Sequence, residues 1–146
     1  MQKERIRATP SWRSSGPRFD PIFVNIDPTP GLGMQGMAIA RVLCFLKIKT
    51  VTNAEYDCAL VQWWTVLGNE PDDITGMWLV EPHIEDSGPL MDIVHLDCVI
   101  RGAHLLPAFG SSWTTPAEFH FSKTLDTFKA YYINKYADHH AFTIAF

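Results

Sequence analysis

Histidine and aspartate side chains, which bind metal ions and transfer protons, gather in two parts of this sequence. The residues that a metal site could use are His95, Asp97, His104, His139 and His140. His95 and Asp97 are two positions apart, so they would share one face of a strand. A metal-dependent hydrolase built on these five side chains is therefore one alternative for the function.

The spacing of these residues favours a structural role instead. None of the zinc-binding patterns HxxxH, HExxH or CxxC is present. The run Asp138, His139 and His140 is typical of a helix end, where cationic side chains near the C-terminus are favoured. We expect His95 and His104 to be hydrogen-bonded residues near the core.

Other signals of catalysis or of cofactor binding are also weak. There is no GxSxG nucleophile motif, and neither Ser111 nor Ser112 has a histidine at an informative spacing. The glycine-rich stretch 31–36 lacks the lysine and the strand-helix context of a nucleotide-binding loop, which favours a flexible linker. The sequence therefore predicts no catalytic residue and no cofactor.

Aromatic residues lie close in sequence to an acidic, turn-rich loop. The members of this set are Tyr56, Trp63, Trp64, Trp78, Asp72 and Asp73. Aromatic faces beside carboxylates bind cations, including methylated lysine in a basic peptide, so this set could form a recognition cage. The alternative is that the rings belong to the core of a small β-domain and that the acids lie in a solvated loop.

The charge of the chain is unevenly distributed, although its formal net charge is only −4. The basic residues of segment 1–18 are Lys3, Arg5, Arg7, Arg13 and Arg18, against the single acid Glu4. The rest of the chain holds seven basic and fifteen acidic side chains. Because phosphates are bound by Lys and Arg, any contact with nucleic acid is expected at this N-terminal arm.

Apolar runs rich in β-branched and aromatic residues predict strands through the middle of the chain. The expected strands are residues 37–48, 56–64, 77–81 and 91–96, with 99–106 either a strand or a helical turn. The residues Leu125, Phe128, Tyr131 and Tyr132 recur at helical spacing, so a helix is predicted from about 122 to 136. Thr115 to Glu118 matches a helix capping box.

These elements predict a mainly β (α+β) fold: a small SH3-like or BAH-like β-barrel, or a bent antiparallel sheet, with a C-terminal helix. Half of the ten prolines and four of the nine glycines lie in residues 1–36. We therefore expect 1–36 to be a flexible basic arm, except around Ile22 to Val24, which could form an extended strand. Residues 37–146 are expected to form a single β-rich domain.

The three cysteines, Cys44, Cys58 and Cys98, are odd in number and lie within apolar runs. This pattern is not that of a secreted disulfide framework, and it predicts reduced thiols in the core. The N-terminal residues lack the apolar stretch of a signal peptide, and no run reaches the length of a membrane-spanning helix. An intracellular location is expected.

Two sequence blocks are more specific than the composition. The first runs from His95 to Pro107 as HLDxxxRxAHLLP, and the second from Asn134 to His140 as NKYADHH. With them, residues 20–146 resemble the C-terminal region of Plavaka-type transposases, which belong to CACTA-like DNA elements of mushroom-forming fungi. The resemblance implies an accessory segment, because the catalytic acids of that family lie in an RNase H-like core that precedes it. It also implies a barrel that holds protein or chromatin partners in the nucleus.

The function predicted first is a non-catalytic interaction module derived from a transposase. Its body would bind a protein or chromatin partner, and its basic arm would contact nucleic acid weakly. The metal-dependent hydrolase and the aromatic cage that reads a methylated peptide remain the alternatives. Bound metal would indicate the hydrolase, whereas loss of peptide binding without unfolding on mutation of Trp63 or Trp78 would indicate the cage.

Overall fold

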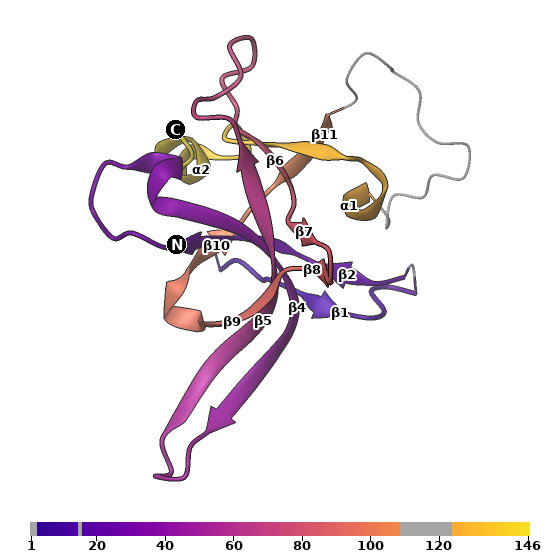
Figure 1. Ribbon diagram of the computed structural model, residues 1–146, viewed down its shortest axis with the longest axis vertical. Helices are drawn as coiled ribbons and strands as arrows, with labels where there is room; N and C mark the ends of the chain where they lie inside the picture. Colours follow the sequence, from indigo (N-terminus) through magenta and orange to yellow (C-terminus); the bar gives the residue numbers. More distant parts are fainter. Residues whose placement is uncertain (1–2, 15, 109–123) are drawn as a thin grey trace.

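The computed structural model describes residues 3–14, 16–108 and 124–146 of the 146-residue chain, as a bent antiparallel sheet (Figure 1). The strands are β1 (Ala8–Thr9), β2 (Arg18–Phe19), β3 (Pro21–Asn25), β4 (Met37–Lys49), β5 (Glu55–Leu67), β6 (Leu79–Pro82), β7 (Ile84–Glu85), β8 (Gly88–Pro89), β9 (Met91–His95), β10 (Val99–Gly102), β11 (Leu105–Ala108) and β12 (Ala130–Ile133). The 3-10 helices are η1 (Gly33–Gly36) and η2 (Leu96–Cys98), and the α-helices are α1 (Thr124–Thr127) and α2 (His139–Ile144).

The main sheet has the strand order β10-β3-β4-β5-β6-β12-β11, and β9 pairs with β5 beside this path. The hairpins β1–β2 and β7–β8 form two separate two-stranded sheets. Among the described residues the end strands β10 and β11 each pair on one side only, so the sheet stays open. The predicted mainly β fold is confirmed in its bent-sheet form.

The longest elements, β4 and β5, form one hairpin whose distal half projects from the body (Figure 1). Their register pairs Ile39 with Trp64 near the body and Lys49 with Glu55 at the tip. The register shifts between Val42 and Cys44, and β4 changes from buried to exposed just beyond this bulge. A bulge increases the local twist, so the hairpin turns away from the core at this point.

The core lies on both faces of the sheet, because the side chains of central strands alternate between two apolar clusters. In β3, Phe23 belongs to one cluster, whereas Ile22 and Val24 belong to the other. The first cluster also contains Trp64 and Tyr131, whose rings meet edge to face with centroids 5.2 Å apart. Burial on both faces is typical of a central strand.

The N-terminal 36 residues differ from the predicted flexible arm. β3 lies between β10 and β4 in the sheet, and Met34 of η1 is buried in the first cluster. Pro21 occupies the first position of β3, where a missing N–H donor is tolerated. The domain therefore begins well before residue 37, and the stretch 31–36 is part of its packed structure.

The C-terminal part contains a helix, as predicted, but the residue range predicted for that helix was wrong. α2 begins after Asp138, whose carboxylate accepts a hydrogen bond from the backbone N–H of Ala141 at 2.8 Å. The helix predicted for 122–136 is replaced by the short α1 and by β12, which pairs with β6 and β11. Because β12 lies between two strands, its backbone N–H and C=O groups find hydrogen-bond partners on both sides. These bonds favour a strand over the helix that the spacing of its apolar residues predicted. The predicted capping box, 115–118, lies outside the described residues.

The predicted strands of the middle region are confirmed as β4, β5, β6 and β9, and the ambiguous stretch 99–106 contributes to β10 and β11. Within the described part of the chain, no helix is long and apolar enough to cross a membrane.

Candidate functional site

The N-terminal basic residues lie on and beside the β1–β2 hairpin, which we call the basic hairpin (residues 3–20). Its turn is closed by a hydrogen bond from the N–H of Trp12 to the carbonyl of Gly16, at 2.8 Å. Arg13 and Ser14 adopt φ values of 50° and 59°, in the left-handed region that tight turns use. The arm predicted from charge is therefore a folded hairpin, not a free tail.

Three guanidinium groups of the basic hairpin surround one aromatic ring. The Cζ atoms of Arg7, Arg13 and Arg18 lie 4.0, 5.0 and 5.2 Å from the ring centroid of the half-buried Trp12. Each distance is within the range of a cation–π interaction. The indole thus holds three positive charges close together.

Asp20 is the acid that holds this cluster to the body. Its carboxylate accepts hydrogen bonds from Nε of Arg18 and from the backbone N–H of Arg7, both at 2.8 Å. The carboxylate therefore holds the Arg18 side chain and the backbone of Arg7 in place beside the ring. Lys3 and Arg5 are exposed just before β1 and add to this positive surface.

A cavity of about 400 Å³ lies beside the basic hairpin, and we call it the basic groove. Its charged and polar lining residues include Arg5, Arg18, Asp20, Arg101 and His104. Arg101 makes a two-pronged ion pair with Asp138, with both nitrogen to oxygen distances 2.7 Å. Glu4 accepts a hydrogen bond from the N–H of Gly102 at 3.0 Å, which fixes the chain that precedes β1 against the body.

Asp138 is strongly acidic in this structure. The hydrogen bond from Arg101, followed by that from the backbone N–H of Ala141, lowers the pKa of the Asp138 carboxyl to about 2, from its ordinary 3.8. A carboxyl with a lower pKa in the folded state stabilises that state when it is ionised. Its contribution is therefore present above pH 3.8 and is lost as the pH falls towards 2.

We expect Asp138→Asn to weaken the pH dependence of stability between pH 4 and pH 2. Asparagine also caps helix N-termini, so the substitution removes the charge and keeps a capping oxygen. The measurement is the urea midpoint of both proteins from pH 7 to pH 2. The explanation fails if the two proteins lose stability in parallel across that window.

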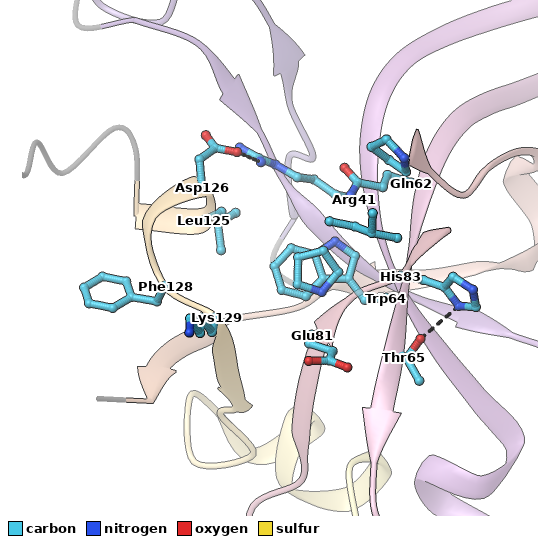
Figure 2. Close-up of a pocket in the computed structure, with 13 residues that line it drawn as sticks. Arg41, Gln62, Trp64, Thr65, Glu81, His83, Leu125, Asp126, Phe128 and Lys129 are labelled. Carbon is cyan, nitrogen blue, oxygen red and sulfur yellow. Dashed lines mark hydrogen bonds and ion pairs between the residues drawn. The ribbon is translucent and has the colours of Figure 1, made fainter. Parts of the chain in front are cut away.

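A second cavity, of about 710 Å³, lies between β5, β6 and α1, and we call it the aromatic cavity (Figure 2). Its labelled lining residues are Arg41, Gln62, Trp64, Thr65, Glu81, His83, Leu125, Asp126, Phe128 and Lys129. Arg41 is only 7% exposed, and its Nη1 donates to Asp126 Oδ1 at 2.6 Å. Its Nε donates to the carbonyl of Phe19 in β2 at 3.0 Å, so this wall reaches the basic hairpin.

The polar rim of the aromatic cavity is held in place by neighbouring strands. Oγ1 of Thr65 and Nδ1 of His83 are 2.9 Å apart, as the dashed line in Figure 2 shows. Nε2 of the same imidazole lies 3.3 Å from a carboxylate oxygen of Glu85. The sequence does not indicate this site, because its residues come from four distant segments. The one sequence signal was a charged residue, Arg41, inside an otherwise apolar strand.

The predicted aromatic and acidic set is not assembled into a cage. Trp64 and Trp78 are 4% and 6% exposed and belong to the first core cluster. Trp63 packs on the opposite face of the sheet, and Tyr56 lies farther along β5 beside His95. For the two buried indoles the alternative interpretation, a core role, therefore holds.

The acids of that set lie in the loop before β6. The Asp72 carboxylate accepts hydrogen bonds from the N–H and the hydroxyl of Thr75, at 2.8 and 2.9 Å, and these lower the pKa of Asp72. Asp73 lies in the same loop and is exposed. Asp72 thus shapes a turn of its own loop.

The histidines predicted as alternative metal ligands are held by different partners. His95 Nδ1 accepts from the N–H of Asp97 at 3.0 Å, and His104 Nδ1 lies 2.8 Å from the amide nitrogen of Asn134. His140 lies 3.4 Å from a guanidinium nitrogen of Arg101, and His139 begins α2. The prediction that these histidines lie at a helix C-terminus was wrong, because Asp138 caps the N-terminus of α2. In the described ranges no three His, Cys, Asp or Glu side chains are placed to hold one metal ion.

The three cysteines are free thiols in different environments. Cys58 is buried, as predicted, and Cys98 is half-buried beside the second core cluster. Cys44 is exposed, because it lies just beyond the bulge where β4 leaves the core. The prediction of three core thiols was therefore wrong for Cys44.

Comparison with protein-family models, with curated proteins and with solved structures finds no match to this chain.

Proposed function

We propose that this chain is a non-catalytic interaction module that contacts nucleic acid through its basic hairpin. The observation that supports this is the group of three guanidiniums within 5.2 Å of the Trp12 ring centroid. Guanidinium groups bind phosphate oxygens through paired N–H donors, and an aromatic ring can stack on a base. A single strand offers both phosphates and unstacked bases, so it is the preferred form.

The charge distribution limits the contact to this end of the molecule. Beyond residue 18 the chain carries an excess of acidic side chains, which repels a phosphate backbone. Few phosphates are therefore engaged, so binding is weak and its salt dependence is modest, in proportion to the few contacts made.

The resemblance to the C-terminal region of Plavaka-type transposases supports the same proposal. An accessory segment of such a protein would work beside a DNA-cutting core, where a basic hairpin is useful. On the same grounds we propose a nuclear location and a protein or chromatin partner for the body.

Removing two charges from the basic hairpin should reduce both the affinity and its salt dependence. We expect the double variant Arg7→Gln, Arg13→Gln to bind a labelled single-stranded oligonucleotide more weakly. The slope of log K against log salt should fall by about 1.4, at about 0.7 for each phosphate contact that is lost. The measurement is fluorescence anisotropy across a series of salt concentrations.

The matched control is Lys47→Gln, which removes a charge from the distal part of the β4–β5 hairpin. Lys47 lies 3.6 and 3.7 Å from acidic oxygens of Glu55 and Asp57 and is well exposed. It should leave the slope unchanged. Equal slopes for all proteins would remove the basic hairpin from the binding site.

A further inference from the structure

The geometry points to the aromatic cavity as a pocket for one unstacked base of the strand that the basic hairpin holds. This inference rests on the proposed function and deepens it, because it gives the module a site that contacts bases as well as phosphates. Four observations support it: the position of the cavity, its charge balance, its hydrogen-bonding groups and its size.

The aromatic cavity adjoins the basic groove. Leu125 lines both, and so forms a shared wall between them. Arg41, in the aromatic cavity, is hydrogen-bonded to Phe19, which follows Arg18 in β2. A strand whose phosphates lie along Arg5 and Arg18 can therefore direct a base over Leu125 into the neighbouring cavity.

The charges of the aromatic cavity select a base over a phosphate. Arg41 and Lys129 are balanced by Glu81 and Asp126 among its lining residues. Two carboxylates in the wall repel a phosphate group, whereas a nucleobase is neutral and meets no such penalty. The wall of the basic groove also has two carboxylates, Glu4 and Asp20, but it has three cations, Arg5, Arg18 and Arg101, so the net positive charge makes it the better place for the backbone.

The cavity also offers the groups that recognise a base. Among the lining residues, the half-buried ring of Phe128 supplies aromatic surface, and stacking on such a ring is worth a substantial part of single-strand affinity. The side-chain amide of Gln62, directly opposite Arg41 across the β4–β5 pair, can both donate and accept on a base edge. Thr65 and His83 add a hydroxyl and an imidazole at the rim.

The size of the cavity also suits a base. The volume of about 710 Å³ is within the range of small-molecule sites and leaves room for a single nucleotide.

The test compares an intact single-stranded oligonucleotide with an abasic one of the same length and charge. Anisotropy titrations use the full chain, its Phe128→Ala variant and a matched Phe45→Ala variant, which removes an exposed ring outside the cavity. We expect Phe128→Ala to weaken the intact strand about tenfold and to leave the abasic strand unchanged. Phe45→Ala should change neither.

A second variant covers the case in which Phe128→Ala disturbs folding. Gln62→Ala keeps the aromatic surface, and it should alter the relative affinities for homopolymers of dA, dC, dG and dT. Thermal melting of each variant separates lost binding from lost structure.

The outcomes distinguish this inference from the proposed function. If intact and abasic strands bind alike and neither cavity variant changes the intact strand, the base pocket is overturned while the hairpin contact stands. If the cavity variants act as expected but the Arg7→Gln, Arg13→Gln protein keeps its full salt slope, the hairpin contact is overturned instead. Absence of binding by either strand overturns both.

Discussion

Trp64→Ala is expected to lower the free energy of unfolding by about 3–5 kcal/mol, the usual cost of removing a large buried aromatic side chain. Trp64 is 4% exposed, lies opposite Ile39 across the β4–β5 pair and meets the ring of Tyr131 with centroids 5.2 Å apart. Its loss leaves a cavity between strands that are far apart in sequence. Urea denaturation followed by far-UV circular dichroism measures the change.

Tyr56→Ala is the matched control, because Tyr56 lies on the same strand and the same face but is 45% exposed. It should lower the free energy of unfolding by about 1 kcal/mol or less, as partly exposed positions do. The experiment also decides between the two interpretations of the aromatic set. A stable Trp64→Ala protein that has lost affinity for a trimethyl-lysine peptide would restore the cage and contradict the core assignment.

The sequence predicted the strands of the middle region because their apolar, β-branched runs are long and bounded by turn residues. It failed where local and tertiary preferences compete. The prolines of residues 1–36 predicted a flexible arm with a strand only around Ile22 to Val24. β3 does form there, but β1, β2 and η1 are ordered as well. Phe128, Tyr131 and Tyr132 have helical spacing, but β6 and β11 supply partners that only the folded chain provides.

The candidate site was predictable only in part, for a related reason. Charge counting located the basic residues, but the role of Trp12 depends on the turn that folds Arg7 and Arg18 around its ring. The aromatic cavity depends on strand register, which sets Gln62 opposite Arg41, and on α1, which adds Asp126. Periodicity within one segment contains no information about such distant pairs.

The second large effect on stability is expected at Gly33, which lies in η1 where this element contacts the C-terminal residues. Gly33 has φ of +56°, and a Cβ atom there would lie 2.3 Å from the backbone oxygen of Phe146. The same oxygen accepts a hydrogen bond from the N–H of Met34 at 2.9 Å, so the contact joins η1 to the residues that follow α2. Glycine is required here both for its backbone conformation and for the absence of a side chain.

Gly33→Ala should therefore lower the free energy of unfolding by roughly 2–5 kcal/mol. About 1–2 kcal/mol comes from placing an L-residue in the left-handed region, and about 1–3 kcal/mol from forcing Phe146 and its neighbours apart. Gly31→Ala isolates the first contribution, because Gly31 has φ of +84° but nothing within 4 Å of its Cβ position. Urea midpoints of both variants should differ clearly. If the two substitutions cost the same, the close approach of Phe146 does not stabilise the fold, and residues 31–36 act as the flexible linker that their composition alone indicated.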